Sequence, residues 1–307
     1  MNPKSHEARS RDDKPFHGLK ISNSDVLHSL DMRSTCPSCT KSRMYFCYTC
    51  FVPVIPLEGR IPLCRLPIKV DIIKHKREID GKSTAAHAAV LAPNEVNIYT
   101  YPEIPDYDLN GKTVLLYPGT EACTVKELFT GKICCKTYSE NVLAELPPGY
   151  IVGTLMTKVF DSELDTNEIF HVAQLPIERL ILIDSTWNQS RGIFADVRLQ
   201  RLPKVVLQNR ISQFWRHQKG SPRWYLSTVE ALHQFLIELH ASAWGLSPHY
   251  QNELTKHYPR HSQGHDCCKP YEGEYDNLLF FFKFMYEKLH TLYKHEDMLA
   301  YKRPMKL

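Results

Sequence analysis

The sequence predicts an α/β protein that is built on a mostly parallel sheet and carries a small cysteine-rich module at its N-terminal end. Residues 180–183 are four consecutive aliphatic residues, a run typical of a strand buried on both faces of a parallel sheet. Other β-prone runs alternate along the chain with segments that begin in helix-capping patterns, as they do in α/β proteins. Two CxxC pairs between residues 36 and 50 indicate the module.

Length and composition are those of a globular protein. The 307 residues, 43% of them hydrophobic, can bury one substantial core with a small appendage. Residues 1–30 are predicted to form a disordered tail, since residues 1–20 are mostly polar and contain no apolar block of the kind that signal peptides have. No apolar run approaches the roughly 20 residues of a membrane helix. We therefore expect a soluble, intracellular protein.

Four cysteines of the N-terminal module are predicted to bind one structural zinc ion. Cys36 and Cys39 form the first CxxC pair, and Cys47 and Cys50 form the second. Each pair can place two thiolates around a tetrahedral ion, and the seven-residue spacer is long enough for a hairpin. The alternatives are a redox pair or buried free thiols, which two pairs so close together do not favour. We assign residues 31–58 to this module.

The main domain is predicted from strands and capped helices that alternate along the chain. Strands are expected over residues 68–75, 96–100, 112–117 and 204–208. Helices are expected over residues 83–91 and after the capping boxes that begin at Thr124 and Ser227. No GxGxxG follows any of these strands, which argues against a standard dinucleotide-binding unit. Gly81 to Ser83 resembles the end of a P-loop, but Lys76 stands where that motif needs glycine.

Two further segments have less regular patterns. Residues 132–174 are interpreted as an insertion that carries one strand over residues 150–155. Residues 246–307 are interpreted as a C-terminal extension with a helix over residues 275–298 that packs on the core. A loop before that helix holds residues that could bind a second metal, although its composition favours unliganded side chains: His257, His261, His265, Cys267 and Cys268.

The strand over residues 180–183 ends at a polar turn with functional side chains. Asp184, Thr186 and Trp187 lie at its carboxyl end, where open α/β folds bind their ligands. Thr186 and Gln189 form a capping-box pattern for a following helix. A carboxylate, a hydroxyl and an indole therefore converge on one turn, although Asp184 could also serve only as a helix cap.

A basic segment follows this turn. Residues 191–223 contain eight Lys or Arg and one acid, Asp196, so the net charge of this segment is +7. The formal net charge of the whole chain is only +4. Such a segment is typical of a polyanion site, and the aromatic residues in or beside it could stack on bases: Phe214, Trp215, Trp224 and Tyr225. The alternative is a solvated basic face above core aromatics.

These residues together resemble the DTW-domain family of tRNA-uridine aminocarboxypropyltransferases. The signature is Asp184-x-Thr186-Trp187. Further segments match the family in the same order between about residues 33 and 240: Arg33 with the cysteines, His75 with Glu78, Thr84-Ala85, Leu116-Tyr117-Pro118, Glu121-Ala122, Leu202-Pro203, Arg223 and Leu226 to Ala231. The insertion before Asp184 and the extension beyond about Ser242 depart from the family pattern.

The resemblance implies a SPOUT-like, knotted α/β catalytic domain over residues 59–245. It implies S-adenosylmethionine as the cofactor, whose 3-amino-3-carboxypropyl group is transferred to N3 of a uridine in the tRNA D-loop with release of methylthioadenosine. It also implies tRNA as the partner and a nuclear location. We expect neither a membrane nor DNA as a partner, and the sequence contains no signal for an oligomeric interface.

The chemistry that the resemblance implies requires a bound sulfonium, a proton acceptor and a basic surface for tRNA. Asp184 is the expected catalytic carboxylate, either as the base for N3 or as the ligand of the cofactor's amino group, with Thr186 beside it; His75 is an alternative base. The expected cofactor-binding residues are Tyr117, Pro118, Trp187, Leu226, Ser227 and Thr228. The expected RNA-binding residues are His75, Arg191, Lys204, Arg210, Arg216 and Arg223. Two other functions stay open: an RNA methyltransferase on the same fold, and a zinc-ribbon RNA-binding adaptor without enzymatic activity.

Overall fold

A computed structural model describes most of the chain. The described residues are 14–119, 121–130, 172–208, 210–215, 225–252, 255, 258, 260, 269–293, 299–300 and 303–304. Several predictions lie outside this set: the strand over residues 150–155, Arg216, Arg223, and the histidine and cysteine residues of the loop over 257–268.

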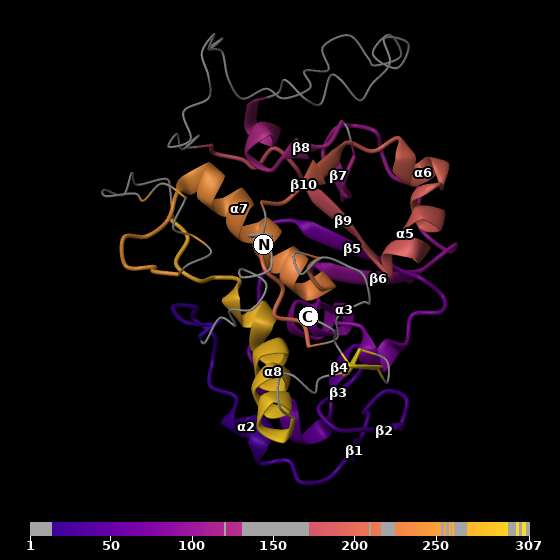
Figure 1. Ribbon diagram of the computed structural model, residues 1–307, viewed down its shortest axis with the longest axis vertical. Helices are drawn as coiled ribbons and strands as arrows, with labels where there is room; N and C mark the ends of the chain where they lie inside the picture. Colours follow the sequence, from indigo (N-terminus) through magenta and orange to yellow (C-terminus); the bar gives the residue numbers. More distant parts are fainter. Residues whose placement is uncertain are drawn as a thin grey trace, which may run out of the picture.

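A six-stranded parallel sheet forms the centre of the protein (Figure 1). Its order across the sheet is β6 (Val96–Thr100), β5 (Lys69–Lys74), β9 (Arg179–Asp184), β7 (Thr113–Leu116), β10 (Lys204–Val206) and β8 (Cys123–Thr124). Each neighbouring pair is parallel, and Lys74 lies opposite Asp184 where β5 and β9 end. The predicted α/β class and parallel sheet are confirmed. The carboxyl ends of all six strands therefore face the same edge.

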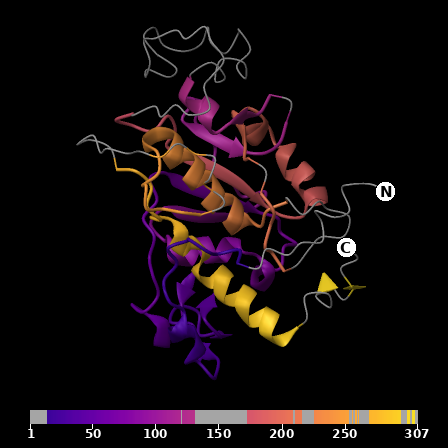
Figure 2. The same cartoon turned by 60° about the vertical axis from the view of Figure 1, so that its left-hand side comes forward.

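Helices cover both faces of the sheet, as the continuous apolar run in β9 predicts. Leu180 and Leu182 point to the face covered by α3 (Ala85–Leu91) and α7 (Thr228–Trp244). Ile181, between them in the sequence, points to the face covered by α5 (Trp187–Phe194) and α6 (Val197–Gln200). Figure 2 shows α7 and α5 on opposite sides of the sheet. Successive strand residues alternate between faces, so two separate cores need a strand that is apolar at every position.

The N-terminal module consists of two antiparallel hairpins. One pairs β1 (Ser34–Thr35) with β2 (Ser42–Arg43), and the other pairs β3 (Phe46–Cys47) with β4 (Val52–Pro53). They share a core with α8 (Phe280–Leu292), which lies beside the module in Figure 1, and with α2 (Asp25–His28). The other short elements are η1 (Ile55–Leu57), η2 (Asp80–Lys82), η3 (Lys126–Thr130), η5 (Asp276–Leu279), and the pair β11 (Leu299–Ala300) and β12 (Arg303–Pro304).

Asp276 joins the two ends of the chain to α7. Its buried carboxylate accepts hydrogen bonds from the Tyr271 hydroxyl at 2.7 Å, from the Lys20 backbone N–H at 2.6 Å and from His233 Nε2 at 2.9 Å. Burial lowers the pKa of His233, so the neutral imidazole donates its Nε2 proton. The sequence placed residues 14–30 in a disordered tail, whereas the structure packs Phe16, Lys20 and Leu27 against the C-terminal extension.

Of the helices in the described part of the chain, none combines the length and apolar character that crossing a bilayer requires.

Candidate functional site

Asp184 ends β9 at the carboxyl edge of the sheet and links three elements there. Its side chain is buried, with the residue 6% exposed. Oδ2 accepts a hydrogen bond from Ser83 Oγ at 2.7 Å, just before α3, and Oδ1 accepts one from Thr228 Oγ1 at 2.5 Å, in the first turn of α7. One carboxylate therefore fixes the starts of two helices against the end of the central strand. Ser83 was not predicted as a partner of Asp184, although its position at the start of a predicted helix is a usual place for a polar contact.

Two carboxyl groups at this edge, those of Asp184 and Glu78, have raised pKa values. Burial raises the pKa of Asp184, although hydrogen bonds from Thr228 and Ser83 and the charge of Lys74 act in the opposite direction. Burial and the nearby charge of Asp184 likewise raise the pKa of Glu78, which is half-buried on the turn that follows β5. Carboxyl groups with raised pKa values at the ligand-binding edge of a parallel sheet are typical of functional sites.

Thr186 and Trp187 begin α5 as predicted. Thr186 caps the helix in a capping box, in which its backbone N–H donates to Gln189 Oε1 at 3.2 Å. Trp187 is half-buried and packs on Tyr225, with ring centroids 4.3 Å apart. Tyr117, at the end of β7, has its ring centroid 6.4 Å from that of Trp187. The rings at this edge therefore form one aromatic group.

The first turn of α7 completes the edge. Ser227 and Glu230 form the predicted capping box, with the Ser227 hydroxyl donating to Glu230 Oε2 at 2.7 Å. The next residue, Thr228, binds Asp184. Of the other expected cofactor-binding residues, Leu226 is half-buried and Pro118 is exposed beside Tyr117. The structure thus brings together the ends of β9 and β7, which carry Asp184 and Tyr117, and the start of α7, which Ser227 caps.

The expected RNA-binding residues lie in different environments. His75 is half-buried at the edge, where its backbone N–H donates to the Asp184 carbonyl at 3.0 Å. Arg191 is exposed on α5. Lys204 is half-buried, and its Nζ donates to the Gln200 carbonyl at 3.0 Å. His75 therefore lies at the end of β9, Arg191 lies on the following helix, and Lys204 lies on β10 beside α6.

Arg210 lies in the interior rather than on a surface. The residue is 7% exposed, and its guanidinium lies 3.5 Å from His233 Nδ1 and 3.5 Å from Gln234 Oε1. Such a guanidinium cannot reach RNA phosphates, so the structure gives no support to the expected RNA contact of Arg210. Phe214 and Trp215 are half-buried and pack against Phe282, whereas Tyr225 contacts Trp187.

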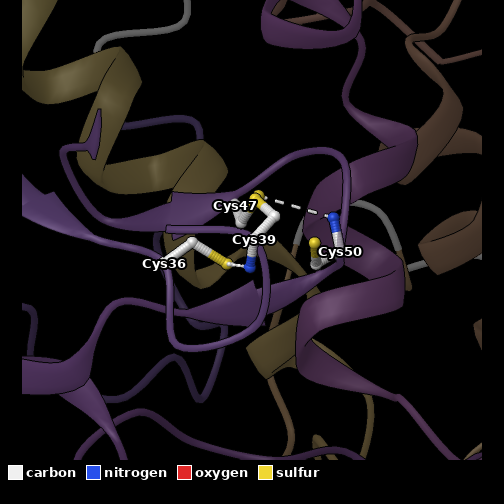
Figure 3. A group of neighbouring side chains, drawn as sticks. All are labelled: Cys36, Cys39, Cys47 and Cys50. Atoms are coloured by element: carbon white, nitrogen blue, oxygen red, sulfur yellow. Dashed lines mark hydrogen bonds between the residues drawn. The ribbon is translucent and has the colours of Figure 1, made fainter. Parts of the chain in front are cut away.

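The four cysteines of the N-terminal module form one cluster (Figure 3). All four sulfur atoms lie within 4.8 Å of one another, and the Sγ atoms of Cys39 and Cys47 are 3.7 Å apart. A tetrahedral zinc ion with Zn–S bonds of about 2.3 Å requires sulfur atoms separated by about 3.8 Å. The cluster could therefore hold a metal ion.

The backbone around the cluster repeats in the two CxxC pairs. Thr40 and Phe51, each directly after a pair, adopt positive φ values of 59° and 56°. Their backbone N–H groups donate to the carbonyls of Cys36 and Cys47 at 3.0 and 2.8 Å. These turns aim N–H groups at the sulfurs, including Cys50 N–H to Cys47 Sγ at 3.4 Å. Burial acts to raise the pKa of the Cys47 thiol, but hydrogen bonds from the backbone of Cys50 and neighbouring groups lower it to about 6, which favours the thiolate that metals bind.

Comparisons with known proteins give one consistent result. Residues 44–290 match the family described as the DTW domain. The chain is 38% identical over 290 residues to tRNA-uridine aminocarboxypropyltransferase 1 of Xenopus laevis, with 92% of this chain and 89% of the relative covered. It is 39% identical to the proteins of the same name from Mus musculus over 280 residues and from Homo sapiens over 277 residues, with 89% of this chain and 83% of each relative covered. No solved structure matches. The chain belongs to the DTW-domain family.

Proposed function

We propose that this protein transfers the 3-amino-3-carboxypropyl group of S-adenosylmethionine to N3 of a uridine in the tRNA D-loop. The observation that carries the proposal is the identity of 38–39% over about nine tenths of the chain to relatives named tRNA-uridine aminocarboxypropyltransferase 1. The carboxyl edge of the sheet supports it, because a buried carboxylate, hydroxyls and three aromatic rings meet there. Bound there, the cofactor supplies an electrophilic carbon next to a sulfonium.

The residues at the edge match what such a reaction needs. N3 of the uridine bonds to the γ-carbon of the cofactor's aminocarboxypropyl group. The bond between that carbon and sulfur breaks with its electron pair left on sulfur, and the N3 proton passes to an acceptor. Aromatic faces attract onium groups, which gives Trp187 and Tyr117 the role of holding the cofactor. Asp184 has the role of accepting the proton or binding the amino group, with Thr186 holding the turn in place. Thr228 begins α7, and the start of a helix can bind a carboxylate or hydroxyl, whereas the Ser227 backbone N–H already donates to Glu230 Oε2 at 2.9 Å.

The proposal includes further properties that the resemblance implies. The parallel sheet of residues 59–245, with the start of α7 bound to the end of β9, supports a SPOUT-like catalytic domain, whose knot is part of the proposal. The cysteine cluster holds a structural zinc ion. His75, Arg191 and Lys204 contact tRNA, together with the sequence-predicted Arg216 and Arg223. A nuclear location is also part of the proposal.

Isotope labelling distinguishes this function from the alternatives. The purified protein is incubated with unmodified tRNA and S-adenosylmethionine labelled in its aminocarboxypropyl carbons, and we expect label in the RNA and methylthioadenosine in solution. Label from the methyl carbon alone, with S-adenosylhomocysteine as the by-product, would establish a methyltransferase instead. Absence of saturable cofactor binding in a calorimetric titration, with salt-dependent tRNA binding intact, would establish an RNA-binding adaptor.

Replacing Trp187 tests the role of the aromatic group. Trp187→Ala is expected to raise the Kd for S-adenosylmethionine about 3- to 30-fold, because cation–π contacts contribute about 0.5–2 kcal/mol. Trp187→Phe keeps an aromatic face and should recover most of the affinity. Trp244→Phe, near the C-terminal end of α7, is the matched control and should bind as the wild type does. Calorimetric affinities that are equal for Trp187→Ala and the wild type would remove Trp187 from the cofactor site.

A further inference from the structure

A second candidate binding site lies between the N-terminal module and the main domain. It is a cavity of about 380 Å³ lined by residues 44–48 of the module, the segment from η2 into α3, Trp215, and α8. Its volume falls in the range of about 300–1,000 Å³ that small-molecule sites occupy. Its lining includes aromatic and cationic side chains: Tyr45, Tyr48, Trp215, Lys82 and Lys288.

The aromatic side chains of the cavity suit a nucleobase. Tyr45 and Tyr48 come from the module, and Trp215 comes from the segment that follows β10. The Trp215 indole Nε1, a hydrogen-bond donor, is buried and has no acceptor among the described residues. Stacking on aromatic rings is how proteins hold unpaired bases of RNA, because every base has a π face.

The charge of the cavity suits a phosphate. Lys288 Nζ donates to the Tyr45 hydroxyl at 2.8 Å, which is a neutral partner, and Lys288 forms no ion pair with any described residue. Lys82 adds a second ammonium group to the lining. Asp80 also lines the cavity, but its carboxylate is paired with Lys74. The lining is therefore net positive, and an anionic group is favoured over a neutral one.

The cavity adjoins the carboxyl edge of the sheet. Ser83 lines the cavity, and its hydroxyl donates to the Asp184 carboxylate. Thr84 also lines the cavity, and its hydroxyl accepts a hydrogen bond from the Val229 backbone N–H in α7 at 3.2 Å. Ser83 therefore contacts both the cavity and the carboxylate proposed for catalysis, so the two sites are adjacent.

We propose that this cavity holds one unpaired nucleotide of the tRNA substrate, next to the uridine that is modified. The base lies against Tyr45, Tyr48 and Trp215, and the phosphate lies near Lys288 and Lys82. The inference rests on the proposed function and adds a contact that selects tRNAs in which that nucleotide can leave the stack. The zinc module and α8, which lie outside the sheet, then act together as part of the RNA-binding surface.

Substitution of two lysines of α8 tests the proposal. Lys288→Gln is expected to raise the Kd of the full-length protein for an unmodified tRNA transcript about threefold to tenfold, and to lower the slope of log Kd against log salt by about 0.7. Lys283→Gln is the matched control, because it removes the same charge from the same helix. The Lys283 side chain pairs with Glu287 at 3.7 Å and does not line the cavity. Equal affinities and salt slopes for the two variants, each with wild-type thermal stability, would overturn the proposal.

Two more measurements keep this result separate from the catalytic proposal. Ultraviolet cross-linking of the bound tRNA, with the adducts mapped by mass spectrometry, is expected to mark Tyr45, Tyr48 or Trp215; adducts confined to residues outside the cavity would overturn the site. S-adenosylmethionine binding should be unchanged in Lys288→Gln. If the wild type transfers no aminocarboxypropyl group, the catalytic proposal fails, whereas the difference in tRNA binding between the two lysine variants is still measured.

Discussion

Asp184→Asn is expected to lower the rate of aminocarboxypropyl transfer at least about 100-fold while the protein stays folded, because a positioned proton acceptor contributes about 10²- to 10⁴-fold to a rate. Asparagine has the shape of aspartate, so it can still accept from one of the two hydroxyls that bind Asp184, and the other hydroxyl can rotate to accept from the amide. The rate is measured with labelled cofactor and unmodified tRNA. A wild-type rate would remove Asp184 from the chemistry.

The affinity for the cofactor separates the two roles proposed for Asp184. If the carboxylate binds the amino group of S-adenosylmethionine, Asp184→Asn should raise the Kd for the cofactor, whereas a base should affect the rate alone. Ser83→Ala is the matched control, since it removes one hydrogen bond to the carboxylate but leaves the carboxylate itself. Asp184→Ala is a poorer probe, because it leaves two inward-facing hydroxyls unpaired at a cost of about 1–3 kcal/mol each.

The dependence of stability on pH follows from the raised pKa of Asp184. A carboxyl whose pKa in the folded protein lies above the ordinary value of 3.8 binds its proton more tightly in the folded state. Its contribution to stability is complete below pH 3.8 and is lost as the pH rises through the raised pKa. Asp184→Asn carries no such charge, so its melting temperature relative to the wild type should increase from acid to neutral pH. A relative decrease over that interval would contradict the raised pKa.

The parts of the fold that the sequence predicts are those set by local pattern. The apolar run of β9 and the β-prone run of β6 give strands within a residue or two of their bounds, and the capping boxes at Thr186 and Ser227 mark the starts of α5 and α7. The box at Thr124 forms too, but it heads the 3-10 helix η3 rather than an α-helix. Two-residue β8 has too short a pattern to be recognised.

Contacts between distant segments could not be predicted in this way. Ser83 and Asp184 are 101 residues apart, and no periodicity relates them. Arg210 was expected to contact RNA because it lies in the basic segment over residues 191–223. Its burial depends on polar groups of α7 and on the charge of Asp276 in the C-terminal extension, which only the tertiary structure brings near it. The site was therefore predictable as a set of strand ends, but the hydrogen bonds that join them were not.

Cys47→Ser is expected to abolish metal binding and to unfold the N-terminal module. Structural zinc contributes about 10–16 kcal/mol to the folding of zinc-finger peptides at pH 7. Cys47 is fully buried, and its module shares a core with α8 and with Val90 and Leu91 of α3, so the melting temperature of the whole protein should fall. Cys64→Ala is the matched control, because Cys64 is a buried thiol outside the cluster. One zinc ion per chain, found by elemental analysis in Cys47→Ser as in the wild type, would contradict the assignment.

Zinc removal should also separate the two binding functions. Tyr45 and Tyr48 flank Cys47 in the sequence, so loss of the metal dismantles the wall that the module gives to the cavity. The carboxyl edge is held by Asp184, Ser83 and Thr228, whose hydrogen bonds involve no residue of the module. Zinc-depleted protein is therefore expected to bind tRNA more weakly and to keep its affinity for S-adenosylmethionine, measured by calorimetry on the same sample. If both affinities are lost together, the module must support the carboxyl edge as well as the cavity.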